Sequence, residues 1–94
     1  MKVFIDIDKT ICVNENKEYS ESKPIIKNIE KVNKLYDDGH IITMWTARGT
    51  MTGINHFNMT YNQLKKWDVK FHELRMGKPD FNILIDDRVL NSIY

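Results

Sequence analysis

Asp6 and Asp8, two carboxylates one residue apart, end a near-continuous apolar run that begins at Val3. Such a run near the start of a chain is typical of a strand buried on both faces, at the centre of a parallel sheet. A buried strand has no structural use for acids, because each costs several kcal/mol unless it is paired or bound to a metal. We therefore expect both carboxylates where the strand leaves the sheet, at its carboxyl end, which is where open α/β sheets bind ligands.

Polar side chains also follow two later apolar segments. Thr46 ends the expected second strand, His40–Thr46, while Asp86 and Asp87 follow the expected fourth strand, Phe81–Ile85. The carboxyl ends of parallel strands lie along one edge of a sheet, so these polar groups should converge with the first two acids.

A cluster of four carboxylates requires a cation. A hard divalent ion with oxygen ligands is the natural partner, and Mg²⁺ keeps some of its waters and binds together with phosphate. The metal and the Lys78 ammonium would neutralise charge on a phosphoryl group, and the Thr46 hydroxyl would donate to one of its oxygens. An aspartate in line with phosphorus could then attack it and form an aspartyl-phosphate.

A strand–helix–strand unit must position these groups. Between the first two strands, residues 25–36 place apolar side chains on one helical face. Ser22 is the expected N-cap, with Pro24 in the first turn, and Gly39 suits a left-handed C-terminal cap. A βαβ unit of this kind has parallel strands and a right-handed crossover.

The rest of the chain divides into shorter elements. We predict a loop or small hairpin over Cys12–Lys23, a loop over Ala47–Asn58, a helix capped by the Thr60/Gln63 spacing, a third strand over Val69–His72, and a helical turn or frayed tail over Arg88–Tyr94.

Length and composition limit the 94 residues to one domain with a modest core. The net charge is +1 with His neutral, so nothing points to a nucleic-acid or membrane surface. Cys12 is the only cysteine, which excludes an internal disulfide and fits a reducing cytoplasm. No apolar run approaches the roughly 20 residues of a membrane span, and the early acids argue against a signal peptide.

In type and order, these motifs resemble those of the haloacid dehalogenase (HAD) superfamily phosphatases. The four matching segments are Asp6-Ile7-Asp8-Lys9-Thr10, Thr46 within the run 43–49, Gly77-Lys78-Pro79, and Asp86-Asp87. The Thr-Ala-Arg-Gly run, the segment Leu64–Lys70 and the Gly-Lys-Pro…Ile-Asp-Asp ending also resemble small capless phosphatases found with capsular-polysaccharide biosynthesis.

The resemblance implies an α/β fold, a capless Rossmann-like three-layer sandwich with a small parallel sheet of strand order 3-2-1-4. It implies that Asp6 is the nucleophile and a metal ligand. It also implies that Asp8 is the general acid and then the base, with its backbone carbonyl on Mg²⁺. Thr46 and Lys78 would hold the phosphoryl group, while Asp86 and Asp87 would complete the metal site, one of them directly.

Three positions leave alternatives open. Lys9 stands where the family often has glycine, and it either steers an anionic substrate or is simply solvated. Arg48 either grips a second anionic group or lies on the surface, and His56 either contacts the substrate or lies on the loop surface. No cap domain fits in the chain, so the cleft should be open or roofed by a second subunit in a homo-oligomer.

The leading hypothesis is a Mg²⁺-dependent phosphomonoesterase acting on a small phosphorylated metabolite, with a sugar phosphate first. The runner-up is a nucleotide or polynucleotide-end phosphatase, because such enzymes share an Ile-Asp-Asp-Arg ending like residues 85–88. The near-neutral charge argues against a polynucleotide, which usually needs a basic groove. A non-catalytic phosphate-binding scaffold is the alternative from another class.

Overall fold

The computed structural model describes residues 1–14 and 18–78. Its elements in chain order are β1 (Lys2–Asp6), β2 (Cys12–Val13), the 3-10 turn η1 (Tyr19–Glu21), β3 (Lys23–Pro24), α1 (Ile26–Asp37), β4 (Ile41–Trp45), α2 (Phe57–Lys66) and β5 (Glu73–Arg75). No helix among these described residues is long and apolar enough to cross a membrane.

Strands β1, β4 and β5 form a parallel sheet in the order β1-β4-β5. The expected βαβ unit is therefore confirmed. Asp6 pairs in register with Trp45, which puts the first acid next to the residue that precedes Thr46. The pairings agree with the 3-2-1 part of the predicted order. The fourth strand, Phe81–Ile85, lies outside the described residues, so the four-strand order stays a prediction.

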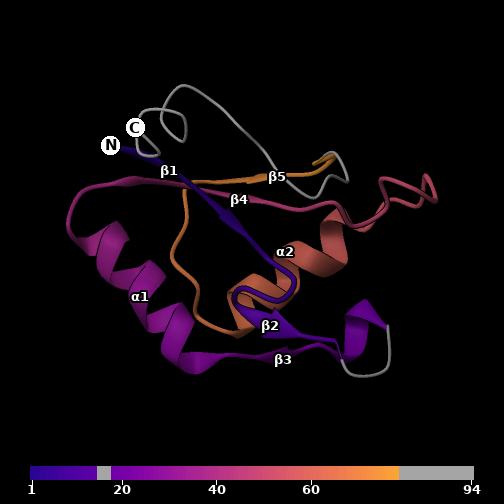
Figure 1. The fold of residues 1–94 in the computed structure, drawn as a ribbon, viewed down its shortest axis with the longest axis horizontal. Coiled ribbons are helices and arrows are strands. Elements are labelled where there is room, and N and C mark those ends of the chain that lie inside the picture. The colour runs from indigo at the N-terminus through magenta and orange to yellow at the C-terminus, as the bar shows by residue number, and fades with distance from the viewer. Residues whose placement is uncertain (15–17, 79–94) are drawn as a thin grey trace, which may run out of the picture.

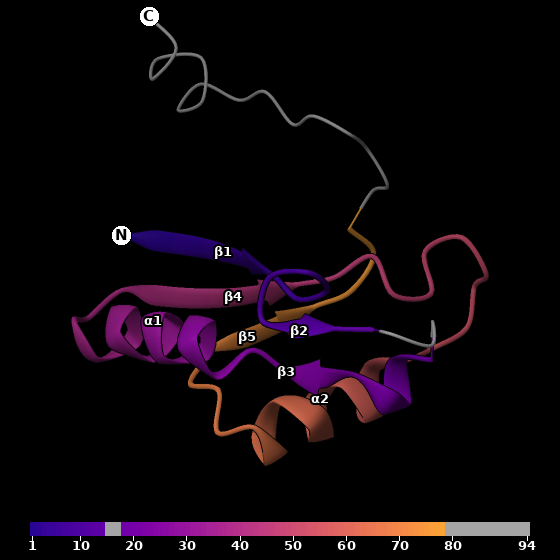
Figure 2. The ribbon, with the colours of Figure 1, turned by 60° about the horizontal axis from the view of Figure 1, so that its bottom comes forward.

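Both helices lie on the same face of the sheet (Figures 1 and 2). The register aligns alternate residues of the strands on the face that packs against the core. The buried apolar core consists of Ile7, Ile11, Cys12, Ile29, Val32, Ile42, Met44, Leu64, Val69 and Leu74. The described residues therefore form two layers, and the third layer of the predicted sandwich is not among them.

The other face of the sheet carries exposed apolar side chains. Phe4 is 49% exposed and Ile41 is 43% exposed. Phe4 packs edge-on against Trp45, with ring centroids 5.6 Å apart. The expectation that the first strand is buried on both faces is therefore wrong for the described structure, because none of its described elements covers this side.

The predicted bounds of the third strand, Val69–His72, are wrong, because the strand that pairs with β4 is Glu73–Arg75. The reason lies at His72, whose Nδ1 accepts the backbone N–H of Ile42 at 3.0 Å. A side chain thus replaces a backbone ladder bond at this point. The regular pairing starts one residue further on, where Thr43 pairs with Glu73.

Both predicted N-caps are wrong. Helix α1 begins at Ile26 without a side-chain cap, because Pro24 pairs with Cys12 in the small β2–β3 hairpin. Helix α2 begins at Phe57, so Thr60 lies inside the helix, fully buried. The C-terminal stop of α1 is confirmed, since Gly39 takes a left-handed φ of 96°.

Candidate active site

Asp6 is the last residue of β1 and faces a lysine from the far end of the described chain. Its Oδ1 accepts the N–H of Ile7 at 2.9 Å, and its Oδ2 lies 3.5 Å from Nζ of Lys78. The Asp6 side chain is 44% exposed, so it remains accessible to a ligand. The structure thus brings together the acid of the first motif and the lysine of the third.

Thr46 joins this group from the carboxyl end of β4. Its backbone N–H donates to the carbonyl of Arg75 at 3.0 Å, and its own carbonyl accepts the N–H of Lys78 at 3.0 Å. The Thr46 hydroxyl oxygen accepts the N–H of Arg48 at 3.1 Å. An oxygen that already accepts one bond keeps its own proton for a further acceptor, such as a phosphoryl oxygen.

The chain reverses direction sharply after the first acid. The carbonyl of Ile7 accepts from the N–H groups of both Thr10 and Ile11, and the N–H of Lys9 donates to the carbonyl of Cys12. Lys9 takes a left-handed φ of 67°, a conformation that glycine adopts without strain. This explains why glycine would suit the position at which the sequence has lysine.

Asp8 is held by a buried arginine. Arg48 Nη2 lies 2.9 Å from Asp8 Oδ1, Arg48 Nε lies 3.1 Å from Asp8 Oδ2, and Asn14 Nδ2 donates to Oδ1 at 2.8 Å. The Arg48 side chain has no exposed surface, whereas that of Asp8 is 24% exposed. The Asp8 carboxylate is therefore directed at protein groups, namely Arg48 and Asn14.

Two titratable groups at this position are perturbed. Burial raises the pKa of Asp8, but hydrogen bonds from Arg48 and Asn14 and the charge of Arg48 outweigh it, so the pKa lies below its usual value. Burial, together with the nearby negative charge of Asp8, raises the pKa of the Cys12 thiol to about 11. In the free protein Asp8 is thus ionised and Cys12 is a neutral thiol.

Arg48 and His56 are both less exposed than a surface role requires. The surface alternative for Arg48 is wrong, because its guanidinium is buried and contacts the protein groups Asp8, Thr60 and Gln63, and its binding of a second anionic group stays a prediction. His56 is partly buried, and its ring packs edge-on against Tyr19 at 5.2 Å. Lys9 is exposed beside Asp8, as both of its alternatives require.

Sequence reasoning missed the partners of Arg48. Tyr19 comes from the segment around the hairpin, and Thr60 and Gln63 come from α2, while Asn14 was missed as a partner of Asp8. Each is an ordinary polar or aromatic residue in a polar segment. The one available signal was Thr60 and Gln63 at a spacing of three, which places both on one helical face but reads equally well as a capping box.

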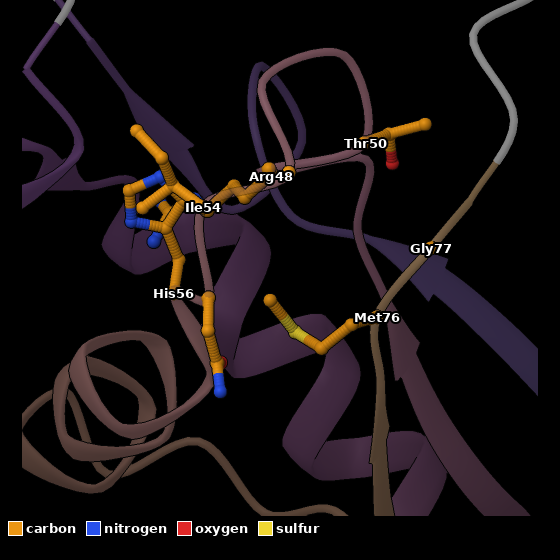
Figure 3. Close-up of a pocket in the computed structure, with 9 residues that line it drawn as sticks. Arg48, Thr50, Ile54, His56, Met76 and Gly77 are labelled. Atoms are coloured by element: carbon orange, nitrogen blue, oxygen red, sulfur yellow. The ribbon is translucent and has the colours of Figure 1, made fainter.

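Two cavities flank the loop that follows Thr46. The larger, about 420 Å³, is lined by Asp8, Lys9 and Tyr19 on one side and by Met51, Thr52, Ile54 and His56 on the other. The second, about 250 Å³, lies between this loop and the segment after β5. Figure 3 shows it with Arg48, Ile54 and His56 on one side and Met76 and Gly77 on the other. A ligand next to Asp8 would thus occupy the larger cavity.

The predicted metal site is described in part. Among residues 1–14 and 18–78, no group of three or more His, Cys, Asp or Glu side chains could hold a metal ion. Asp86 and Asp87 lie outside these residues. The accessible Asp6 carboxylate and the backbone carbonyl of Asp8 are oxygen donors of the kind that Mg²⁺ binds. These two predicted ligands therefore suit a magnesium site.

Comparisons with known proteins show the fold. No protein-family model matches the chain, and no curated protein matches it. The crystal structure of a structural-genomics target from Vibrio cholerae is similar, with a TM-score of 0.83 and 26% identity over 93% of this chain and 80% of that one. A chain in the structure of the Pnkp1/Rnl/Hen1 complex has a TM-score of 0.66 and 15% identity over 98% of this chain. This chain spans 32% of that one, and at this identity the likeness shows the fold alone.

Proposed function

We propose that the chain is a Mg²⁺-dependent phosphomonoester hydrolase of the HAD type. One observation carries the proposal: an accessible carboxylate, a hydroxyl and an ammonium from three separate segments meet at the carboxyl edge of a parallel sheet. The Asp6 Oδ2 to Lys78 Nζ distance of 3.5 Å joins the carboxylate and the ammonium, and the buried Thr46 is tied to Lys78 by a backbone bond of 3.0 Å. A nucleophile beside two donors for phosphoryl oxygens is what transfer to an aspartate requires.

The first half of the reaction forms an acyl phosphate on Asp6. A carboxylate oxygen of Asp6 attacks phosphorus while the bond from phosphorus to the leaving oxygen breaks. Asp8, which is ionised in the free protein, takes up a proton from solvent when the dianionic phosphate binds beside it, and it gives this proton to that leaving oxygen. Lys78 and Thr46 bind the non-bridging oxygens throughout.

The second half restores the enzyme. Water attacks the phosphorus of the aspartyl-phosphate, Asp8 takes the proton from that water, and phosphate leaves with Asp6 free again. The pKa of Asp8 lies below its usual value, so the carboxylate is ionised, which is the state in which it can accept this proton. Bound Mg²⁺ would neutralise phosphoryl charge, held by Asp6, the Asp8 carbonyl, Asp86 and Asp87.

The leaving group would occupy the larger cavity, which begins at Asp8. Its volume of about 420 Å³ suits a small molecule, and a sugar phosphate remains the substrate that we propose first. The resemblance to capsule-type phosphatases supports this choice. A cytoplasmic location and a homo-oligomer that roofs the cleft belong to the same proposal.

A nucleotide or a polynucleotide end is the second candidate. The fold similarity to a chain of the Pnkp1/Rnl/Hen1 complex supports it, as do the aromatic and apolar side chains of Tyr19, Met51 and Ile54 on the cavity wall. The net charge of +1 offers little attraction for a long polyanion, so a mononucleotide is the better form of this candidate.

Phosphate release tests both candidates. Purified protein is incubated with sugar phosphates, mononucleotides and a 3′-phosphorylated oligonucleotide, with Mg²⁺ and with EDTA. We expect Mg²⁺-dependent release, no turnover in Asp6→Asn and a strong loss in Asp8→Asn. Full activity of Asp6→Asn would end the covalent mechanism, and no turnover across the panel would favour the phosphate-binding scaffold.

A further inference from the structure

Arg48 is the most heavily bonded buried charge in the described part of the chain. A guanidinium without exposed surface is costly unless its charge and its donors are matched. Its ion-pair partner within residues 1–14 and 18–78 is Asp8, at 2.9 Å. Because the buried Arg48 guanidinium pairs with Asp8, the proposed acid–base residue, it can fix the position of the Asp8 carboxylate.

The main chain of Arg48 is tied to the phosphoryl-binding hydroxyl. Its N–H donates to Thr46 Oγ1 at 3.1 Å, and the next residue, Gly49, takes a φ of 82° that turns the chain away. One residue therefore contacts Thr46 through its backbone and Asp8 through its side chain. It sets the spacing between the oxygen that binds phosphate and the oxygen that moves the proton.

Helix α2 and Tyr19 also hold the Arg48 guanidinium in place. Arg48 Nη1 donates to Gln63 Oε1 at 2.6 Å and to Thr60 Oγ1 at 3.2 Å, both from α2. The Tyr19 ring centroid lies 4.7 Å from Arg48 Cζ, and Gln63 Nε2 donates to the Tyr19 carbonyl. These contacts restrict the guanidinium to one orientation, and with it the carboxylate that it pairs.

We propose that Arg48 is a positioning residue, which aims Asp8 at the leaving-group oxygen and spaces it from the Thr46 hydroxyl. The inference rests on the proposed function and adds a role for a residue that does not touch the substrate. In the step concerned, the bond from Asp6 to phosphorus forms, the ester bond breaks, and the Asp8 proton passes to the leaving oxygen. Arg48 acts on the last of these events.

The test compares substrates whose leaving groups differ in how strongly they need the proton from Asp8. A sugar phosphate or glycerol phosphate leaves as an alcohol only when protonated, whereas 4-nitrophenolate leaves from its phosphate unaided. We compare kcat/KM for both substrate kinds in wild type, Arg48→Met, Arg48→Lys and Gln63→Leu. The matched control is Arg75→Met, which removes an exposed arginine that contacts Glu73 and the Phe4 ring.

We expect Arg48→Met to lower kcat/KM for the alkyl phosphate at least tenfold more than for 4-nitrophenyl phosphate. Gln63→Leu should show the same selectivity more weakly, Arg48→Lys should restore part of it, and Arg75→Met should leave both substrates unchanged. In an Asp8→Asn background, Arg48→Met should cost little more, because the group that it positions is already lost.

Equal losses on both substrates would overturn the inference, since a merely structural arginine would damage both alike. Circular dichroism spectra and urea unfolding curves identify folded variants. If Arg48→Met does not fold, Gln63→Leu and Arg48→Lys decide by the same ratio. Wild-type protein that releases phosphate from neither substrate overturns the proposed function and the inference together, whereas active wild type with unselective variants overturns the inference alone.

Discussion

At the scale of single residues, Lys9 has an unfavourable backbone conformation, and its ammonium either steers an anionic substrate or is solvated. Its φ of 67° costs a non-glycine residue about 1–2 kcal/mol. We predict that Lys9→Gly raises the free energy of unfolding by about 1 kcal/mol, after the larger entropy of an unfolded glycine is subtracted. Urea unfolding followed by circular dichroism measures this change.

Lys9→Ala is the matched control, because it removes the ammonium and keeps the strained backbone. Its stability should stay within about 0.5 kcal/mol of wild type. If the ammonium steers substrate, both variants should raise KM equally, and an unchanged KM in both would assign Lys9 to solvent. A Lys9→Gly variant no more stable than Lys9→Ala would contradict the strain assigned here.

Cys12 should be chemically inert in the folded protein. Its side chain is fully buried, and its pKa is raised to about 11, so almost no thiolate exists at pH 8. We predict that iodoacetamide labels Cys12 slowly in native protein and fast in urea, as measured by mass spectrometry. The native rate should climb only as the pH approaches 11, and labelling at equal rates in both states would contradict the burial.

At the scale of elements, the loop after Thr46 depends on one glycine. A Cβ at Gly49 would lie 2.0 Å from the Ile54 carbonyl oxygen, and its φ is 82°. We predict that Gly49→Ala destabilises the protein by more than about 1 kcal/mol and lowers activity, because the loop must rearrange beside Arg48. Thermal unfolding and phosphate release measure the two effects.

Gly53 provides the control within the same loop. Its φ is 73°, but no described atom lies within 4 Å of an added Cβ. Gly53→Ala should therefore carry only the backbone strain and cost less than Gly49→Ala. Equal costs would show that close approach to Ile54 adds nothing.

The sequence predicted the convergence of Asp6 and Thr46 because a βαβ unit dictates where parallel strands end, whereas the place of Lys78 followed from the motif resemblance. It did not predict element starts that depend on long-range partners. The capping role of Thr60 was wrong because a buried guanidinium 12 residues earlier uses its hydroxyl. The third strand was placed too early because a side-chain nitrogen of His72 takes a ladder bond. Local patterns carry no information on either contact.

At the scale of the whole molecule, the described residues build one finished face and one open face of the sheet. One face packs against α1 and α2, while the other exposes Ile41 and Phe4, whose ring packs against Trp45. The composition predicted a modest core, and the structure has one. The sequence could not predict which face of the sheet is covered, because β4 carries apolar side chains on both faces. Ile42 and Met44 lie on one face, and Ile41 and Trp45 lie on the other.

The backbone bonds of Thr46 to Arg75 and to Lys78 fix the number of residues between Arg75 and Lys78. We predict that adding one alanine between Met76 and Gly77 displaces the ammonium by about 3.3 Å and abolishes phosphate release, even in a folded protein. One alanine added at the exposed Met51–Thr52 loop tip should change the wall of the larger cavity but keep phosphate release measurable, because Asp6, Thr46 and Lys78 keep their spacing. Natural length variation among active homologues should accordingly gather at the loop tip and be missing from the four positions 75–78.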